Sequence, residues 1–376
     1  MTPTLGRDAA TVLHDDLDAI VGGLAAELPL LAGRRVLVTG GAGFLGYELV
    51  QALLGWNDGV GAGDRIHVDV WDSYARGLPG WLAALERRPD LTLRRHDVVA
   101  PLPDDLPRFD FVVHAAGIAS PTYYRQHPLE TMDANVMGLR RLLDHARERG
   151  EEGDPLTGFL FFSSSEIYGD PSPDAIPTTE DYRGNVSCTG PRACYDESKR
   201  FGETLCVTFA THYGVPVSMA RPFNNYGPGL KLADRRVIPD FARDVLDGRD
   251  IVLLSSGSPT RTFCYVADAV VGYLKILTRG APGEAYNIGM EGPEVSMGEL
   301  AELVAAAARE LFAYEGRVVR AQSGDELYLV DNPERRCPSI EKARSELGFE
   351  PSVALEDGIR RALVWYTGPD SLGEAA

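Results

Sequence analysis

The chain has 376 residues, of which 44% are hydrophobic and 24% charged, and it is long enough for two domains. Its 37 basic and 55 acidic residues give a net charge of −18, and no basic run stands out. This balance argues against nucleic acid and anionic membrane as partners. An anionic ligand has to be held by a few local arginines, lysines and backbone N–H groups, because the net negative charge of the protein repels it.

Residues 1–33 carry a short apolar pattern of helical spacing among several acidic residues. They lack the basic start of a signal peptide and are too acidic to span a bilayer, so we expect a helical N-terminal extension lying on the main domain. The five cysteines form no Cys-x-x-Cys pair and share no zinc spacing with the seven histidines. We therefore expect reduced thiols, no metal site and a cytoplasmic protein.

Residues 35–39 form a β-branched apolar run that leads into a glycine-rich turn and then a helical stretch at 47–54. Glycines at this turn let the backbone bend tightly and approach a pyrophosphate, which then lies on the N–H groups of the helix N-terminus. The strand, turn and helix together predict a dinucleotide site. The residues of the turn that we assign to the cofactor are Gly40, Gly43, Phe44, Leu45 and Gly46.

A second strand is predicted over residues 67–72, and it ends in an acid, Asp72. This carboxylate would accept the adenosine ribose hydroxyls and repel a 2′-phosphate, so NAD is favoured over NADP. The spacing from Gly40 to Asp72 is longer than usual, and we expect an enlarged surface loop over residues 55–64.

Two further strands are predicted over residues 91–95 and 109–114. Asp97, after the first of them, meets either the adenine amino group or only its own loop. Small residues after the second strand let a cofactor lie over the strand end, and His114 is interpreted as a packed histidine. The further cofactor residues assigned to these strand ends are Ser73, Arg76, Asp97, Val98, Ala115 and Gly117.

A helix is predicted over residues 132–149, where Asn135 is either a helix-interior bonding residue or part of a proton relay. The strand that follows, 158–162, delivers three serines, a glutamate and a tyrosine within residues 163–169. Ligands of open α/β sheets bind at this carboxyl edge. A serine cluster is often only turn chemistry, but beside a bound sugar it becomes a set of donors.

The stretch 190–200 opens a helix and sets Tyr195 four residues before Lys199. At this spacing the two side chains lie on one helix face, so an ammonium sits beside a phenol whose ordinary pKa is about 10. That neighbour favours the phenolate and predicts Tyr195 as a base for proton and hydride transfer. Such a pair also occurs by chance on amphipathic helices, so the assignment depends on the glycine turn, Asp72 and the strand-end serines.

At this point the chain resembles the extended short-chain dehydrogenase/reductase family of nucleotide-sugar enzymes. Thr39 to Gly46 resembles its TGGxGFxG loop, and Tyr195 with Lys199 its YxxxK pair. Within the family the likeness is greatest to the UDP-glucuronate decarboxylase branch. The runs that carry this likeness are 163–171, 190–200 and 220–228.

The resemblance implies an α/β fold, with a Rossmann-type doubly wound parallel sheet and a smaller C-terminal α/β substrate lobe. It places the NAD-binding domain at 34–220, with a return segment near 260–280, and the nucleotide-sugar lobe at 221–376. It further implies a homodimer formed through helices 132–149 and 195–213.

The resemblance also implies a mechanism for the strand-end residues. Tyr195 as phenolate removes the C4 hydroxyl proton while NAD takes the hydride, Lys199 assists it, and Ser164 bonds the same sugar oxygen. The resulting 4-keto uronic acid loses carbon dioxide, because the electrons flow into an enolate that donors stabilise. Ser165 and Glu166 would orient the sugar carboxylate or bring a proton to C5.

Glu166 separates the branches of the family. Dehydratases of dTDP-glucose typically carry Asp-Glu where this chain has Ser165 and Glu166, and 4-epimerases generally carry no carboxylate there. A Ser-Glu pair also occurs in GDP-mannose 4,6-dehydratases. A 4,6-dehydratase or 4-epimerase therefore stays the alternative enzyme, and a silent NAD-binding scaffold the alternative without activity.

The lobe begins after a predicted strand over residues 215–220, opens a helix at 235–239, and closes with helices at 339–347 and 355–366. By the resemblance, Asn224 and Asn225 face the diphosphate or nicotinamide. The resemblance also assigns anion-binding roles to three arginines, each of which taken singly is otherwise a surface ion pair. These are Arg236 near substrate and cofactor, Arg261 at the sugar carboxylate or diphosphate, and Arg336 at the nucleotide diphosphate.

Three positions depart from the decarboxylase pattern. Ser339 stands where aspartate is common, Asp133 where lysine often touches substrate, and Gly117 where serine is usual. The resemblance therefore leaves open whether the 4-keto pentose is released or reduced to UDP-xylose, and whether the nucleotide is uridine or thymidine.

Overall fold

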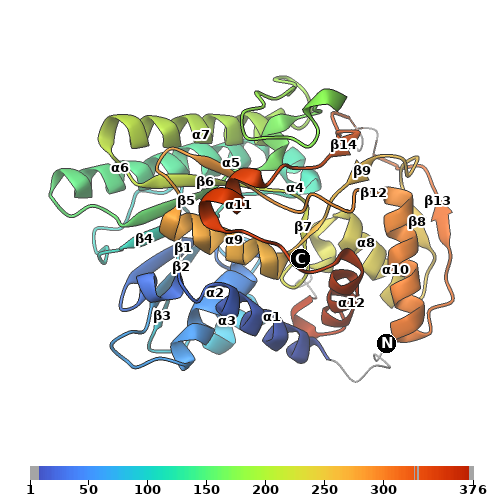
Figure 1. Ribbon diagram of the computed structural model, residues 1–376, viewed down its shortest axis with the longest axis horizontal. Helices are drawn as coiled ribbons and strands as arrows, with labels where there is room; N and C mark the ends of the chain where they lie inside the picture. The colour runs from blue at the N-terminus through green and yellow to red at the C-terminus, as the bar shows by residue number, and fades with distance from the viewer. Residues whose placement is uncertain (1–7, 326, 328–329, 372–376) are drawn as a thin grey trace.

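The computed structural model describes residues 8–325, 327 and 330–371, so residues 1–7 of the extension and 372–376 of the lobe lie outside the described residues. Its centre is a seven-stranded sheet in the order β11-β6-β5-β4-β1-β2-β3 (Figure 1). Every neighbouring pair is parallel, and the order is that of a doubly wound dinucleotide-binding fold. The strands are β1 Arg35–Thr39, β2 His67–Asp72, β3 Leu91–Arg95, β4 Phe111–His114, β5 Gly158–Phe162, β6 Val217–Pro222 and β11 Ala285–Ile288.

Helices cover both faces of this sheet, as the alternation along β1 shows. Val36 and Val38 pack into the core that includes α1, α2 and α9, while Leu37 packs into a second core with α6 and α7. The predicted α/β class with a doubly wound parallel sheet is therefore confirmed. The helices of the domain that contains this sheet are α2 Phe44–Asp58, α3 Gly80–Leu85, α4 Pro121–Gln126, α5 Pro128–Asp133, α6 Leu139–Glu151, α7 Ala193–Tyr213 and α9 Val266–Arg279.

Two predicted elements differ from the structure. The expected loop over 55–64 is shorter, because α2 continues to Asp58 and Asn57 is buried in it, bonded to the Ile66 backbone. The expected helix over 132–149 is not continuous, because a π-helical turn, Ala134–Gly138, lies between α5 and α6. Gly138 packs there against Val98, where an added Cβ would come within 2.7 Å of the valine side chain.

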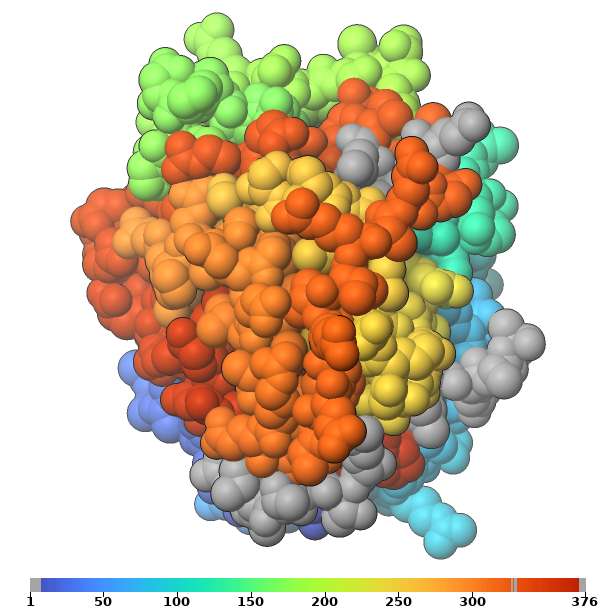
Figure 2. All heavy atoms as spheres, turned by 90° about the vertical axis from the view of Figure 1, so that its right-hand side faces the viewer, coloured from blue at the N-terminus to red at the C-terminus, as the bar shows by residue number. Residues whose placement is uncertain are grey.

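The rest of the chain after β6 builds most of the smaller lobe. Three short strands form a sheet in the order β12-β9-β14, β10 pairs with β7, and β13 pairs with β8. Figure 2 shows its outer face, where α10 in orange lies beside the yellow segment of α8 and β8. The elements are β7 Asn225–Tyr226, α8 Val237–Leu246, β8 Ile251–Leu253, β9 Thr260–Arg261, β10 Cys264–Tyr265, β12 Val295–Ser296, α10 Met297–Phe312, β13 Val318–Arg320, β14 Arg335–Arg336, α11 Glu341–Leu347 and α12 Leu355–Trp365. The 3-10 turns are η1 Leu28–Leu31, η3 Ser165–Tyr168, η4 Pro173–Ala175, η5 Leu232–Asp234 and η6 Pro369–Ser371.

The N-terminal extension is helical, with α1 over Ala9–Gly23 packed on α2, α9 and α12. The fully buried Asp16 of α1 accepts hydrogen bonds from the Tyr265 hydroxyl at 2.6 Å and from Arg361 at 2.7 Å. The helix is therefore joined to the lobe by buried polar contacts as well as by apolar packing. Within the described ranges, every helix is too short or too polar to cross a membrane.

Candidate active site

The glycine turn is held close against the end of β4. Gly40 has a φ of +72°, and a Cβ there would lie 2.6 Å from the backbone of Ala116. A Cβ on Gly46 would lie 2.2 Å from the Gly41 carbonyl oxygen. Only glycine fits these two positions. Because no side chain projects from them, a pyrophosphate can approach the backbone N–H groups at the first turn of α2.

Asp72 lies against this turn at the end of β2. Its carboxylate accepts hydrogen bonds from the backbone N–H of Ala42 at 3.2 Å and of Tyr74 at 2.8 Å. Burial raises the pKa of Asp72, although both hydrogen bonds act in the opposite direction. The acid thus sits beside the pyrophosphate loop, in the place where the ribose of a dinucleotide is recognised.

The other residues assigned to the cofactor differ in burial and in their hydrogen-bond partners. Val98 is buried against Gly138, whereas Asp97 is exposed and accepts only from the Val99 N–H, as in an ordinary loop. Arg76 is not free, because its guanidinium donates to Asp234 of η5 at 2.7 Å. Of the others, Ser73 accepts from the Ala75 N–H, Phe44, Leu45 and Ala115 are half-buried, and Gly117 is exposed.

Gly117 has a steric reason to lack a side chain. A Cβ at this position would lie 2.8 Å from Asn135 Oδ1 and 3.9 Å from Lys199 Nζ. Asn135 donates to the Ser198 hydroxyl at 2.9 Å, while its Oδ1 has no hydrogen-bond partner. The serine that the family resemblance predicts at 117 would crowd this buried amide, so Gly117 and Asn135 belong to one packing arrangement.

Tyr195 and Lys199 are both buried on α7. The Tyr195 hydroxyl shares a hydrogen bond with Ser164, and burial raises the pKa of Tyr195 to about 12 despite that bond and the charge of Arg236. The Lys199 ammonium donates to the Phe162 carbonyl at 2.7 Å, and burial lowers its pKa to about 7. The expected depression of the phenol pKa by Lys199 is not found in this structure, because burial disfavours both charged forms.

Sequence reasoning missed Tyr124, on the short helix α4. Its ring stacks on that of Tyr195 with centroids 5.0 Å apart and planes 11° apart, and its buried hydroxyl has no hydrogen-bond partner. No motif or periodicity marks this tyrosine. His114, by contrast, is a packed histidine as predicted, since it is bonded to Thr39 and burial lowers its pKa to about 3.

Glu166 is held by two arginines from distant parts of the chain. Arg336 of β14 binds both of its carboxylate oxygens, at 2.7 and 2.5 Å, and Arg192 binds one of them at 2.5 Å. Burial would raise the pKa of Glu166, but the two guanidinium groups outweigh it and hold that pKa far below its usual range. Glu166 therefore stays ionised, which favours the first of its two expected roles, orienting the sugar carboxylate, over bringing a proton to C5.

The arginines of the lobe make different contacts from those expected. Arg336 gives both terminal nitrogens to Glu166, which places it at the strand-end carboxylate rather than free for a diphosphate. Arg261 is buried and donates to the carbonyls of Thr260, Pro333 and Glu334. It therefore holds the segment that leads into Arg336, since it donates to that segment and to its own strand.

The remaining assigned residues lie around the same region. Arg236 donates to the Ala119 carbonyl at 3.1 Å and has an unpartnered Nε, while Asn225 accepts from Tyr273 and has an unpartnered Nδ2. Asn224 donates to the Thr262 carbonyl at 2.8 Å. Ser165 is buried and opens η3, next to Ser164, whose hydroxyl caps that turn by accepting from the Glu166 N–H.

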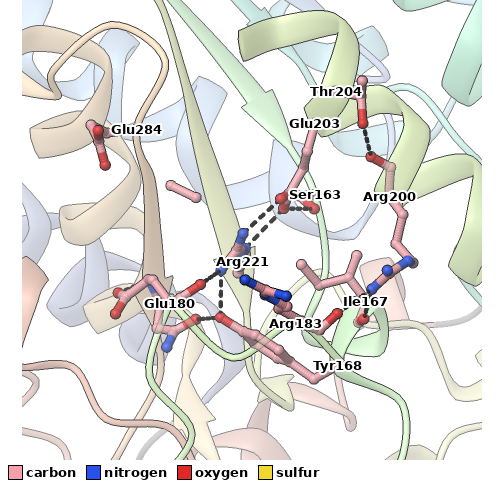
Figure 3. Close-up of polar contacts among 12 residues, drawn as sticks. Ser163, Ile167, Tyr168, Glu180, Arg183, Arg200, Glu203, Thr204, Arg221 and Glu284 are labelled. Carbon is pink, nitrogen blue, oxygen red and sulfur yellow. Dashed lines mark hydrogen bonds and ion pairs between the residues drawn. The ribbon is translucent and has the colours of Figure 1, made fainter. Parts of the chain in front are cut away.

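A second buried polar network contacts both ends of the segment 163–168, which follows β5 (Figure 3). Arg221 of β6 binds both carboxylate oxygens of Glu203, at 2.9 and 2.7 Å, and also donates to the Tyr168 hydroxyl at 2.7 Å and the Glu180 carbonyl at 2.9 Å. Ser163 donates to the same carboxylate at 2.5 Å. Both ends of the segment 163–168 are thereby fixed, which holds Ser164 and Glu166 in place between them.

Comparison with known proteins agrees with this geometry. Residues 36–289 match the NAD dependent epimerase/dehydratase family. UDP-glucuronic acid decarboxylase 6 of Arabidopsis thaliana is 37% identical over 328 residues, covering 87% of either chain. UDP-glucuronic acid decarboxylase 1 of Xenopus tropicalis is 34% identical over 337 residues, covering 89% of this chain and 72% of the relative.

Solved structures match the same length of chain. An epimerase from Methanothermobacter thermautotrophicus has a TM-score of 0.76 at 26% identity, covering 92% of this chain and 96% of its own. The dTDP-glucose 4,6-dehydratase DesIV of Streptomyces venezuelae, with NAD bound, has a TM-score of 0.74 at 28% identity, covering 89% and 97%. The chain belongs to the NAD-dependent epimerase/dehydratase family, the extended short-chain dehydrogenases/reductases, and NAD is its cofactor.

Proposed function

We propose that this protein is a UDP-glucuronate decarboxylase, which oxidises C4 of the sugar, releases carbon dioxide, and yields UDP-xylose, UDP-4-keto-pentose or both. The observation that carries the proposal is the Glu166 carboxylate, fixed by Arg192 and Arg336 at the strand end that also bears Ser164. Curated relatives named for this activity cover most of the chain, which supports it.

The residues around the glycine turn fit NAD. The close approach at Gly40 and Gly46 leaves the loop backbone accessible to a pyrophosphate, and Asp72 presents a carboxylate beside it. NAD, when bound, supplies the acceptor for the C4 hydride and the donor that returns it. Gly40, Gly46 and Asp72 would hold its adenosine diphosphate part, with Tyr195 and Lys199 toward the nicotinamide ribose.

Tyr195 takes the proton from the C4 hydroxyl in the proposed reaction. Its phenolate is favoured by the hydrogen bond with Ser164 and by the charge of Arg236, which act against burial. Once C4 is a ketone, Tyr195 and Ser164 become donors to its oxygen. They stabilise the enolate that forms when the C5 carboxylate leaves as carbon dioxide, because donors fixed in a buried site need no reorganisation.

Arg336 and Arg192 bring two positive charges to the same strand end, and among the described residues Glu166 is the one carboxylate that hydrogen-bonds to them, while Asp196 lies 3.9 Å from Arg192. A net positive charge is left over, which suits a sugar that carries its own carboxylate at C5. Glu166 acts here as the fixed anion that orients both guanidinium groups. We accordingly place Arg336 at the sugar in this proposal, and Arg261, Asn224 and Arg236 toward the diphosphate.

The experiment is to incubate the purified protein with UDP-glucuronate and NAD and to follow carbon dioxide and the sugar nucleotides by mass spectrometry. We expect loss of the mass of carbon dioxide from the substrate. The same run with dTDP-glucuronate compares the two nucleotides. UDP-glucuronate left intact, or converted to an isomer of unchanged mass, would contradict the decarboxylase.

The second candidate is a nucleotide-sugar 4,6-dehydratase or 4-epimerase, which the 28% identity to a dTDP-glucose 4,6-dehydratase favours. Loss of water from a nucleotide hexose would establish the dehydratase, and interconversion of C4 epimers the epimerase. NAD binding with no turnover of any of these sugars would instead indicate the silent scaffold.

We propose a homodimer formed by the expected helices 132–149 and 195–213, which in the structure are the end of α5, the π-helical turn, most of α6, and α7. These elements carry large apolar side chains that are exposed in the single chain, among them Met137 and Phe201, and a hollow lined by Val136 and Leu205 lies between them. Phe201→Glu should give a monomer in light scattering. Leu30→Glu is the matched control, since Leu30 is 51% exposed and Phe201 50%, and it should stay dimeric. A monomeric wild type would contradict the proposal.

Two coarser assignments complete the proposal. We infer a cytoplasmic location from five free cysteines, two of them exposed or half-buried. We keep the division into an extension at 1–33, an NAD-binding domain at 34–220 with its return near 260–280, and a substrate lobe at 221–376. Limited proteolysis with and without NAD would test that division, since NAD should protect the first of the two large parts.

A further inference from the structure

Asp196 follows Tyr195 directly on α7 and is 4% exposed. One of its carboxylate oxygens, Oδ2, lies 3.9 Å from Arg192 Nε, which is too far for a hydrogen bond. The other, Oδ1, is buried and has no hydrogen-bond partner. A buried carboxyl left without a close partner is unusual, because its ionised form is costly to bury.

The groups that face Asp196 come from several elements. Glu166 of η3 and Asp331, before β14, carry negative charge toward it, while Arg192, at the N-cap of α7, and Arg336 of β14 carry positive charge. Burial and Glu166 raise the pKa of Asp196 to about 8, and the two arginines only partly oppose this. Asp196 therefore holds a proton at neutral pH while Glu166, in the same cluster, does not.

Other unpartnered atoms belong to the same cluster. The Tyr124 hydroxyl, Arg192 Nε and Arg336 Nε are buried and lack hydrogen-bond partners, as does Asp196 Oδ1. The Tyr124 hydroxyl lies within the electrostatic reach of Arg192, Glu166 and Asp196. Buried polar atoms of this kind are the ones that ordered solvent satisfies in proteins.

The proposed function, on which this inference rests, consumes a proton that Tyr195 does not supply. When the bond between C5 and the carboxylate breaks, its electron pair forms the enolate, and C5 must then take up a proton. Tyr195 took its proton from the C4 oxygen and must return it there when the ketone is reduced. Glu166 is ionised by Arg192 and Arg336, so the proton for C5 comes from another group.

We propose that Asp196 is the store of the C5 proton. Its carboxyl gives the proton to a solvent molecule among the unpartnered atoms, that molecule protonates C5, and the Asp196 carboxylate left behind is stabilised by Arg192. A proton from bulk water restores the carboxyl before the next turnover. Asp196 thus acts through solvent as a positioning residue for protonation, while Tyr195 remains the base for oxidation.

The test compares Asp196→Asn, Asp196→Glu and wild type with UDP-glucuronate and NAD. Asparagine keeps the shape but has no proton to give, so we expect kcat to fall by about 10²-fold, the usual range for a general acid. NADH formation in a single turnover should stay near the wild-type rate, because oxidation does not use this proton. Glu197→Gln, on the next residue and half-buried beside Arg200, is the control and should match wild type.

The pH profile separates a proton store from a structural carboxyl. Wild-type kcat should fall as the pH rises above about 8, since the protonated form is the active one, and Asp196→Glu should keep such a limb. Asp196→Asn should lack it. An asparagine variant with wild-type kcat, or with a reduced kcat and the alkaline limb intact, would overturn the role of Asp196. A wild type that releases no carbon dioxide would overturn the proposed function itself, and this inference with it.

Discussion

Arg336 and Glu166, 170 residues apart in the chain, form a buried ion pair through two parallel hydrogen bonds of 2.7 and 2.5 Å. The pair joins the lobe strand β14 to the carboxyl end of β5 in the central sheet. Two charge-assisted bonds of this geometry fix both partners in orientation. Removing Glu166 leaves two buried guanidinium groups without their anion, and removing Arg336 leaves Glu166 with Arg192 alone. Breaking a buried ion pair typically costs about 3–5 kcal/mol.

Arg336→Ala should therefore lower both activity and stability. We expect kcat for carbon dioxide release to fall at least about 10²-fold, because a fixed positive charge is lost at the sugar carboxylate, and the melting temperature to fall as well. Arg335→Ala is the matched control, since Arg335 is exposed and bonds Glu294 at the surface. A surface pair is worth about 1 kcal/mol or less, so its kcat should change less than about fivefold. Equal losses in the two variants would contradict the role of Arg336.

Glu166→Gln should keep NAD binding and slow decarboxylation. The amide cannot neutralise Arg192 and Arg336, so both guanidinium groups lose the anion that orients them. We expect a fall of about 10²-fold in carbon dioxide release, with the NAD dissociation constant unchanged in a fluorescence titration. Unchanged turnover would show that the carboxylate has only a structural role.

The central sheet could be predicted from the sequence because its signals are local. The runs 35–39, 67–72, 91–95 and 158–162 are the observed bounds of β1, β2, β3 and β5. The first and last are short apolar runs, and the other two largely alternate apolar and polar residues. The glycine turn and Asp72, the acid that ends β2, likewise indicated the cofactor site. Signals of this kind lie within a few residues, so no tertiary contact is needed to find them.

The pairing of charges could not be predicted, because it depends on segments far apart. Glu166 was expected either to orient the sugar carboxylate or to bring a proton, and its ionised state follows from the approach of Arg192 and of Arg336 from β14. Asp196 lies inside the stretch that drew attention to Tyr195, yet the charges of Glu166 and Arg336, which act on its pKa, come from η3 and β14. The π-helical turn at Ala134–Gly138 was also missed, since one extra residue in a helix leaves no clear mark on the apolar pattern.

Tyr124 should matter through its ring for the oxidation step. It stacks on Tyr195 at 5.0 Å, so Tyr124→Phe keeps the stack and Tyr124→Ala removes it. We expect single-turnover NADH formation to stay within about fivefold of wild type in the phenylalanine variant and to fall at least about tenfold in the alanine variant, because Tyr195 loses a fixed position. Equal rates for the two variants in stopped-flow absorbance would show that the stack does not position Tyr195.

The contact between the N-terminal helix and the main domain should weaken as the pH rises. Glu48 of α2 is fully buried with neither carboxylate oxygen bonded, and burial together with the nearby Asp16 raises its pKa well above the usual value. Burial also raises the pKa of Asp16 to about 6, although Tyr265 and Arg361 bond it. Both acids therefore hold protons in the folded state that they lose in the unfolded state, whose carboxyl pKa is about 4.

The sign follows from this difference in bound protons. The contribution of these two acids to the free energy of unfolding is fully present below about pH 4. It is lost as the pH rises through their folded-state pKa values, because the folded state binds more protons than the unfolded state in that interval. Glu48→Gln removes the part of this pH dependence that is due to Glu48. The free energy of unfolding of the variant should therefore match that of wild type near pH 4. At pH 8 it should be higher by about 1–3 kcal/mol, the usual cost of an unsatisfied buried polar group. Urea unfolding at both pH values measures this, with the exposed Glu315→Gln as control. A Glu48→Gln variant that loses stability with pH as steeply as wild type would show that the Glu48 carboxyl is not the source of the dependence.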